Sequence, residues 1–563
     1  MSDPADRLAR ALARVDGAFE GETAPERLLL EGRFEEAAAA AGNDRVGVFV
    51  RAAAALARGD LAACREALAG GDGAEAHALR ALLAAKEGDL AAAEAALDKA
   101  AKLTRRAWPW VLRCGLREGA NDFGGARLAL EEALRREKEP WLWAELARVE
   151  ERNGVIPRAL KAAERAIAGE PSLPHRRLRA HLLECWREHD EAAAEYARAL
   201  KDAPADPGLL FSRSRVLSAA GRMKEALADA RAAEASSGGD EGLLAWRLQV
   251  QLLAGGAAAA TAEARRRVKD RKTSPDLAGK LRFLLAYALL RARRWAPAAE
   301  ALGELAEGLP EGDALARRAS FYRTVALLLA GSKVPRPLER LLLLGLGVDP
   351  PYTATAAMLK AIVGADVVFN NVMGDEMFEF LRALNPVVRA VNYHQDNDEG
   401  RLAALMLKEC AAGRRAAFVT RGNAIVYGPL GSLMLERAKA KGWRWRCEPS
   451  ASSWEFIVGR QAPDPFAGRG MAVLDSRAAA AGLLLDPGLP TTVFFNMEVG
   501  EDAVADACRA LAGQRRPDAP ALVLDHVVGQ QPQRWTAAEV ESRRDHLSVS
   551  AIVHYPAVER SPA

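Results

Sequence analysis

The sequence has few of the residues that build metal centres and disulfide frameworks. Only six of its 563 residues are cysteines and eight are histidines. The cysteines, at positions 64, 114, 185, 410, 447 and 508, are far apart, and no two form a C-x-x-C pair. This spacing argues against a zinc site and against a disulfide-rich secreted fold. The first residues also lack the apolar core of a secretory signal. We therefore expect reduced thiols, no bound metal and a cytoplasmic protein.

An excess of charge and a long apolar run are also missing. The 78 Lys and Arg residues nearly balance the 75 Asp and Glu residues, which leaves a net charge of +3. A protein held to nucleic acid by phosphate contacts would need a larger basic excess. The longest apolar runs, Val325–Ala330 and Leu341–Leu346, are far shorter than the roughly 20 residues that span a bilayer. We expect binding to neither nucleic acid nor membrane.

What the sequence does contain is a repeat over its first 330 residues. A turn residue, often Gly, is followed five positions later by Ala or Cys and an amphipathic stretch. The turn residues are Gly32, Gly59, Gly88, Asn121, Gly154, His189, Gly221, Gly255 and Arg294. Their spacing clusters near 34 residues, the period of a helix-turn-helix repeat. This predicts stacked helix pairs, because one such pair cannot bury its own apolar face.

A second small residue stands seven positions before most of these turns. It is Ala52, Ala81, Cys114, Ala147 or Ser214 in five repeats. In three others the position holds Leu182, Leu248 or Tyr287, so we expect those repeats to pack differently.

These residues resemble the tetratricopeptide family from roughly Arg33 to Ala330. The resemblance implies an all-α solenoid with a face that holds peptides or protein partners. Five tryptophans, at positions 108, 110, 141, 143 and 186, are candidate peptide anchors. At helical spacing, aromatic residues are more typical of packing, and we favour that interpretation.

The helical period stops where a glycine and two prolines, Gly331, Pro335 and Pro337, interrupt it. We expect a repeat domain over residues 1–330, a linker over 331–338 and a second domain over 339–563. In that domain short apolar runs alternate with helix-length segments, which predicts an α/β fold with a mostly parallel sheet. The expected strands are 341–344, 366–369, 387–393 and 416–420, and the expected helices are 354–363, 377–384 and 401–412.

The first predicted strand ends in a G-x-G turn at Gly345 and Gly347, with Thr353 expected to cap the next helix. Such glycines let backbone groups approach a ligand closely. A dinucleotide fingerprint would need a third glycine where Pro350 stands, and an acidic residue at the end of the second strand, whereas Asp366 opens it. The sequence therefore disfavours a nicotinamide or flavin dinucleotide site.

Several predicted strand ends carry motifs in one order along the chain. After Gly345-Leu-Gly347 come Tyr393–Arg401, Thr420–Pro429 and Glu448–Trp454. This series resembles the S-adenosylmethionine-dependent tetrapyrrole methylase superfamily, from roughly Glu339 to Pro562. Within it the chain looks closest to borosin-type peptide backbone N-methyltransferases. The features that carry this closer likeness are Tyr393–Arg401, Ser452–Glu455, Phe494–Gly500 and Ser548–Pro556.

The resemblance implies S-adenosyl-L-methionine as cofactor and assigns two sets of residues. The implied cofactor-binding residues are Gly345, Gly347, Gly422, Asn423, Val426, Ser452, Ser453 and Asn496. The implied catalytic residues are Tyr393, His394, Arg401 and Tyr427. Arg401 would stabilise the developing imidate oxygen of a peptide amide, while Tyr393 or His394 would accept its proton. The structural alternative is that Arg401 makes a surface contact at a helix start and His394 is a loop residue.

Some positions depart from the family pattern. Val348 and Asp349 stand where many members have Pro-Gly, and Ser450 replaces a glycine. A tetratricopeptide scaffold with a degenerate methylase-like domain therefore stays an alternative, as does a methyltransferase for small molecules.

The substrate and assembly are expectations from the resemblance. Borosin-type enzymes often carry a C-terminal substrate tail, and here the chain ends at Ala563, soon after the last predicted strand. We expect a peptide or protein substrate supplied in trans and recruited by the repeats, and a homodimer formed through the methylase-like domain.

Overall fold

The structure is a computed structural model that describes most of the chain. The described residues are 33–42, 45–120, 122–310, 312–331, 334, 336–346, 351–372, 375–391, 399–420, 429–448, 472–475, 489–494, 500–524, 533–544 and 552–555. They belong to two compact units. Unit 1 consists of Met1–His175 with Met471–Ala563, and unit 2 of Arg176–Gly470. The division falls within helix α12 (Leu173–Cys185).

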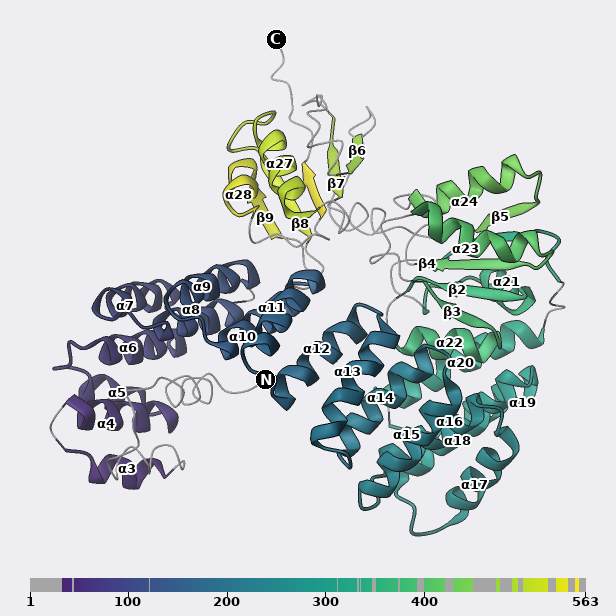
Figure 1. Cartoon of the computed structure of the whole chain (residues 1–563), viewed down its shortest axis with the longest axis horizontal. Coiled ribbons are helices and arrows are strands. Elements are labelled where there is room, and N and C mark those ends of the chain that lie inside the picture. The colour runs from purple at the N-terminus through teal and green to yellow at the C-terminus, as the bar shows by residue number, and fades with distance from the viewer. Residues whose placement is uncertain are drawn as a thin grey trace. The chain divides into compact units, whose positions relative to one another are not determined.

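Antiparallel helix pairs make up the N-terminal part of the chain, as the repeat predicted (Figure 1). Unit 1 contains α3 (Phe34–Ala40), α4 (Arg45–Ala57), α5 (Leu61–Ala67), α6 (Ala74–Lys86), α7 (Leu90–Leu103), α8 (Trp108–Gly119), α9 (Phe123–Arg136), α10 (Pro140–Arg152) and α11 (Ile156–Gly169). Unit 2 contains α13 (His189–Asp202), α14 (Pro207–Ala219), α15 (Met223–Ser236), α16 (Glu241–Leu253), α17 (Ala257–Lys269), α18 (Pro275–Arg291), α19 (Trp295–Glu307) and α20 (Ala314–Ala330).

Most turns between the two helices of a pair contain a glycine in the left-handed region. The φ angles are 79° at Gly59, 84° at Gly88, 77° at Gly154, 80° at Gly221 and 94° at Gly255. A Cβ atom disfavours this conformation, which is why glycine is the usual residue there.

Two turns use arginine in the same conformation, and they correct the predicted register. Arg187 has a φ of 62° and Arg293 a φ of 56°. They are the turn residues of their repeats, whereas His189 begins α13 and Arg294 stands at the N-cap position of α19. Gly154, Arg187 and Gly221 are 33 and 34 positions apart, so the period is more regular than the sequence suggested.

The corrected register also removes two apparent exceptions to the small-residue pattern. Seven positions before the turns stand Ala180 and Ala286, both fully buried, in place of the Leu182 and Tyr287 that the sequence had assigned. Leu248 keeps its place as a large, fully buried residue in this position. These close-packed alanines let the helices of each pair approach one another.

The first sheet lies in unit 2 and all its pairings are parallel. Its strands, in the order β3-β2-β4-β1-β5, are β3 (Val388–Ala390), β2 (Val367–Asn370), β4 (Ala416–Thr420), β1 (Leu341–Gly345) and β5 (Trp445–Glu448). The helices between them are α21 (Ala356–Gly364), α22 (Asp375–Leu384), α23 (Glu399–Ala411) and α24 (Pro429–Ala440). The α/β expectation is confirmed.

Both faces of this sheet are covered by helices, which explains its continuous apolar strands (Figure 1). Leu342 and Leu344 of β1 pack with residues of α21 and α22 on one face. Leu341 and Leu343 pack with residues of α23 and α24 on the other. The helix cap differs from the prediction, because the Thr355 hydroxyl caps α21 while the Thr353 hydroxyl donates to the carbonyl of Leu346.

The core of unit 2 is continuous from the repeats into the sheet. Buried side chains of α16, α18, α19 and α20 form one cluster with those of β1, α21 and α22. In this cluster Phe321 and Tyr322 of α20 lie with their ring centroids 5.6 and 6.1 Å from that of Phe380 in α22. The repeat helices of unit 2 therefore bury apolar surface of the α/β fold. The expected domain limits themselves stay a prediction.

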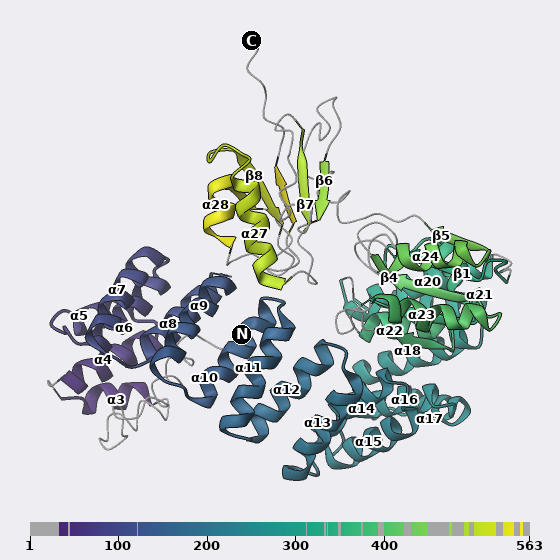
Figure 2. The same cartoon turned by 45° about the horizontal axis from the view of Figure 1, so that its top comes forward.

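The second sheet lies in unit 1 and is mixed (Figure 2). Its order is β6 (Ala472–Asp475), β7 (Thr491–Phe494), β10 (Ile552–Tyr555), β8 (Pro520–Leu524) and β9 (Gln533–Thr536). β6 and β7 are parallel and the other pairs antiparallel. The helices α27 (Gly500–Ala512) and α28 (Ala537–Ser542) share a buried cluster with these strands.

Two expectations from composition can be compared with the structure. None of the six cysteines, all of which lie in the described ranges, forms a disulfide, and Cys64, Cys114, Cys410 and Cys508 are buried. Within the described ranges, no helix combines the length and apolarity that a membrane span requires.

Candidate functional site

The candidate site is the edge of the first sheet where its parallel strands end. β4 stands between β2 and β1 in the sheet. The helices that follow β1 and β2 cover one face, whereas the helix that follows β4 covers the other. Adjacent strands whose connections leave to opposite faces make a topological switch point, and ligands of open α/β sheets bind beyond the carboxyl ends of the strands there.

The described strand ends at this switch point are well ordered by hydrogen bonds. Gly345 of β1 is paired with Thr420 of β4, and the N–H of Leu346 donates to the carbonyl of Thr420 over 2.9 Å. At the end of β2 the side chain of Asn370 is fully buried. Its amide accepts a hydrogen bond of 2.9 Å from the N–H of Val372 and donates one of 3.1 Å to the Val372 carbonyl. These bonds fix where the following segments begin.

A cation from the repeats reaches this edge. Arg187, the turn residue between α12 and α13, donates from Nη1 to the carbonyls of Asn370 and Val391, over 3.3 and 3.2 Å. Its guanidinium carbon lies 6.0 Å from the ring centroid of Phe378 in α22. The side chain is 7% exposed, and Nη2 has no hydrogen-bond partner within the described part of the chain.

Arg187 is a charged residue with little exposure to solvent. No carboxylate pairs with it among the residues that the structure describes. Burial lowers the pKa of its guanidinium to about 10, which still leaves it protonated at neutral pH. A buried charge is costly unless an opposite charge or hydrogen bonds compensate for it.

The sequence contains a signal for Arg187 that the predicted register did not use. Among the turn residues described at positive φ in the repeats, glycine is the rule, and arginine occurs only at 187 and 293. The guanidinium of Arg293 also donates to a carbonyl of the α/β fold, that of Val363, over 3.1 Å. An arginine that replaces a turn glycine therefore marked a long-range contact.

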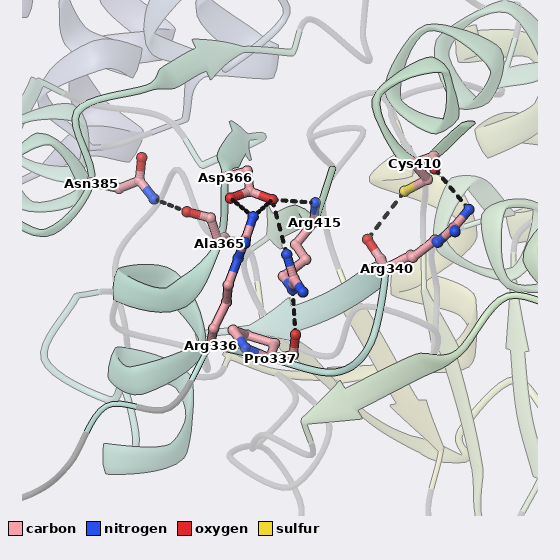
Figure 3. A network of polar contacts seen from close by, with 8 residues as sticks. All are labelled: Arg336, Pro337, Arg340, Ala365, Asp366, Asn385, Cys410 and Arg415. Carbon is pink, nitrogen blue, oxygen red and sulfur yellow. Dashed lines mark hydrogen bonds and ion pairs between the residues drawn. The ribbon is translucent and has the colours of Figure 1, made fainter. Parts of the chain in front are cut away.

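The opposite edge of the sheet has a polar network that holds Arg336 and Pro337, which precede β1 (Figure 3). Asp366 accepts hydrogen bonds of 2.9 Å from Arg336 and 2.8 Å from the N–H of Arg415. Burial alone would raise the pKa of Asp366, but these donors outweigh it and hold the pKa below its usual value. The Arg415 side chain also donates to the carbonyl of Pro337. This network lies at the amino ends of β2 and β4, so its role is structural.

Two of the predicted site residues fall within the described part of the chain. Gly345 is buried at the carboxyl end of β1, and Arg401 is exposed in the first turn of α23, the helix that follows β3. Gly345 ends β1, and Arg401 lies at the start of the helix that follows β3, so both belong to the carboxyl edge of the sheet. The remaining candidates lie outside the described residues: Gly347, Tyr393, His394, Gly422, Asn423, Val426, Tyr427, Ser452, Ser453 and Asn496. Their roles stay predictions.

No family model matches this chain. No curated protein matches it either. Among solved structures it is similar to uroporphyrin-III-C-methyltransferase from Thermus thermophilus, with 19% identity, a TM-score of 0.31 and coverage of 38% of this chain and 93% of that one. It is also similar to the methyltransferase CobJ, with 14% identity, a TM-score of 0.31 and coverage of 40% and 97%.

A further solved structure is similar to the chain and is a TPR protein. YrrB, a TPR protein described as having an unusual peptide-binding site, is 20% identical with a TM-score of 0.26. The match covers 29% of this chain and 87% of that one.

Proposed function

We propose that the chain is an S-adenosylmethionine-dependent methyltransferase that acts on a peptide or protein supplied in trans. The observation that carries the proposal is the pairing of Gly345 with Thr420 at the switch point of the parallel sheet. Both strands run there into glycine-containing segments, Gly345-Leu-Gly347 and Arg421-Gly422. Ligands bind at such points, and the resemblance of the motifs to tetrapyrrole methylases supports this cofactor.

The described residues fit a ligand of this kind in two respects. Gly345 presents no side chain at the end of β1, which leaves the backbone open to a close approach. The unpartnered Nη2 of Arg187 supplies a cation at the end of β2, whereas no described carboxylate pairs with it. S-adenosylmethionine, when bound, supplies a methyl group activated by its sulfonium.

The chain's own contribution is positioning and proton handling. Holding donor and acceptor at near-attack distance accounts for about 7–11 kcal/mol of a bimolecular barrier. A peptide nitrogen is a weak nucleophile, so its activation requires removal of its proton or stabilisation of charge on the carbonyl oxygen. We assign charge stabilisation to Arg401 and proton transfer to Tyr393 or His394, with Tyr427 lining the pocket.

In unit 2 the first helices of two repeats contact helix α22 of the same chain, so this surface is not open to a peptide substrate. Gln249 in α16 donates to the Glu379 carboxylate over 3.2 Å, and Tyr287 in α18 donates to the Glu379 carbonyl over 2.8 Å. Both residues stand six positions before the turn residue of their repeat, on its first helix. The first-helix face of these repeats therefore holds α22, in the way that a groove holds an amphipathic helix.

We assign recruitment of the substrate to the same face of the unit 1 repeats. In α8 the equivalent position, six before residue 121, is Gly115, and a Cβ there would meet nothing within 4 Å. The tryptophans are weaker candidates because Trp108 is buried and arginines cover two rings. The guanidinium of Arg113 lies 4.5 Å from the ring centroid of Trp110, and that of Arg165 lies 4.4 Å from that of Trp143.

Substitution is a better test of recruitment than deletion. Removing residues 1–330 would strip repeat side chains from the core they share with β1, α21 and α22. Gly115→Trp should raise the KM for the peptide that accepts the methyl group and leave kcat and cofactor affinity unchanged. Leu103→Trp, at an exposed position of α7, is the matched control. Unchanged KM in both variants would remove the recruiting role.

Titration calorimetry with S-adenosylhomocysteine tests the proposed function itself. We expect the wild type to bind it, and Gly345→Val to abolish binding because a side chain would enter the strand end. Asp366→Asn, at the opposite edge, should leave the affinity unchanged. A folded wild type that binds no nucleoside would favour a scaffold with a degenerate methylase-like domain.

A further inference from the structure

We propose that Arg187 binds the carboxylate group of a ligand at the carboxyl edge of the first sheet. The inference deepens the proposed function and rests on it for the identity of the ligand. It assigns part of the binding site to the repeats, far from the glycine motifs in the sequence.

The first argument is the position of the residue. Arg187 adopts a φ of 62°, which a glycine would adopt more easily, and five other repeats have glycine at their turn. An arginine in this conformation is expected where the side chain has a task. Arg293, the other exception, uses its guanidinium for a carbonyl of the α/β fold. Arg187 does the same with Nη1 only, and Nη2 has no described partner.

The second argument is charge. Arg247 is about as buried as Arg187, at 8% exposure, and two carboxylates pair with it, those of Glu234 and Glu263, over 2.7 and 2.8 Å. Arg187, at 7% exposure, is held by two carbonyl oxygens and by the ring of Phe378. Carbonyl dipoles compensate for a full charge less well than a carboxylate does. Among the described residues no anion pairs with Arg187, so a ligand carboxylate would supply the missing counter-charge.

The third argument is location. The carbonyl of Asn370 that Arg187 contacts closes β2, and the next residue, Asn371, donates its N–H to the Val419 carbonyl in β4 over 2.8 Å. Neighbouring strands are about 4.8 Å apart, so the guanidinium lies within one or two strand spacings of the β4–β1 switch point. A ligand bound at the switch point needs to extend only that far to reach it.

A guanidinium with free N–H groups suits a planar carboxylate. Two sources fit the proposed function: the amino-acid carboxylate of the cofactor, and an acidic group of the substrate. Matched ligands separate them. S-adenosylhomocysteine has the carboxylate, and its decarboxylated analogue keeps the adenosine, the sulfur and the amine. Citrate serves as a free carboxylate probe, added with and without S-adenosylhomocysteine.

The experiment measures the affinities of the full-length wild type, Arg187→Met and Arg187→Lys by calorimetry. Arg293→Met is the matched control, because Arg293 is also a turn residue that donates to the α/β backbone. If the cofactor supplies the carboxylate, Arg187→Met should weaken S-adenosylhomocysteine about tenfold to hundredfold. The affinity of Arg187→Met for the decarboxylated analogue should be unchanged. Arg187→Lys keeps the charge, so its affinity for S-adenosylhomocysteine should lie between those of the wild type and Arg187→Met. This variant also covers the case in which Arg187→Met does not fold.

The other outcomes are equally specific. If the substrate supplies the carboxylate, Arg187→Met should bind both nucleosides normally and lose the thermal stabilisation that citrate gives the wild type. Equal losses for both nucleosides, or no effect on either nucleoside or on citrate, would overturn the inference and leave Arg187 as a structural contact. A wild type that binds citrate through Arg187 and binds no nucleoside would overturn the proposed cofactor while the carboxylate site stands.

Discussion

The phenolic hydroxyl of Tyr287, in a repeat helix, donates a hydrogen bond of 2.8 Å to the backbone carbonyl of Glu379, in helix α22 of the α/β fold. The two residues are 92 positions apart in the sequence. Nearby, Arg382 of α22 donates over 2.7 Å to the carbonyl of Ser218 at the end of α14. Arg291 of α18 donates to the carbonyl of Arg382, also over 2.7 Å. The repeats of unit 2 and the α/β fold are thus joined by polar contacts as well as by a shared apolar core.

The contribution of this joint is measurable with two tyrosines. Tyr287→Phe should lower the free energy of unfolding by about 1 kcal/mol, because it removes a made hydrogen bond. Tyr322 is equally buried, and its hydroxyl has no partner among the described residues. Tyr322→Phe should therefore be neutral or stabilising. Denaturant unfolding of the two variants is the measurement, and equal losses would contradict the assignment.

The corrected register of the repeats makes a second prediction. Ala192, five positions after Arg187, is fully buried, whereas Ala194, which the sequence had placed there, is exposed. Ala192→Leu should destabilise the protein by about 1–3 kcal/mol through overpacking. Ala194→Leu should change stability by less than about 0.5 kcal/mol. Thermal unfolding of both variants distinguishes the two registers. If Ala194→Leu destabilised the protein more than Ala192→Leu, the turn residue would be His189 and not Arg187.

The second sheet contains a pH-sensitive histidine. His554 of β10 is buried, and one ring nitrogen lies 2.9 Å from the Thr492 hydroxyl of β7. Burial and, to a smaller extent, Arg515 hold the pKa of His554 below its usual value of 6.5. The stability it contributes is complete above pH 6.5 and is lost as the pH falls through the folded-state pKa, because the unfolded chain takes up the proton first.

This is testable with His554→Asn. Unfolding free energies of the wild type should fall between pH 7 and pH 5 more steeply than those of the variant. Parallel curves would show that the histidine does not contribute.

The pKa of Asp366 is shifted downward, as expected of a carboxylate that accepts hydrogen bonds from cations. Its pKa lies below the usual 3.8, so its contribution is complete above pH 3.8 and is lost as the pH falls through the folded-state value. Asp366→Asn should cost about 1–2 kcal/mol at neutral pH, a modest figure because Arg336 is largely exposed. The stabilities of the wild type and the variant should converge once the pH falls below the folded-state pKa, which is itself lower than 3.8. A constant difference at all pH values would indicate a steric effect of the substitution.

Much of the fold could be read from local patterns. The strand β4 has the limits predicted for it, 416–420, and α22 begins two residues before its predicted start at Met377. Apolar runs and helical spacing report which backbone conformation a segment adopts, since both depend on neighbours in the sequence. The register error at His189 arose because alanine stands five positions after both Arg187 and His189, so the repeat pattern alone does not distinguish them.

The sequence by itself determined the repeat period, the helix pairs and the alternation that makes a parallel sheet, because these follow from residues within one or two turns or strands of each other. Only the tertiary structure decided that Arg187 reaches the ends of β2 and β3, across 183 and 204 positions of sequence. It also decided that α22 occupies the repeat face that the sequence had left for a partner. Such contacts depend on the simultaneous packing of several segments that are distant in sequence, and a local sequence pattern does not specify that packing.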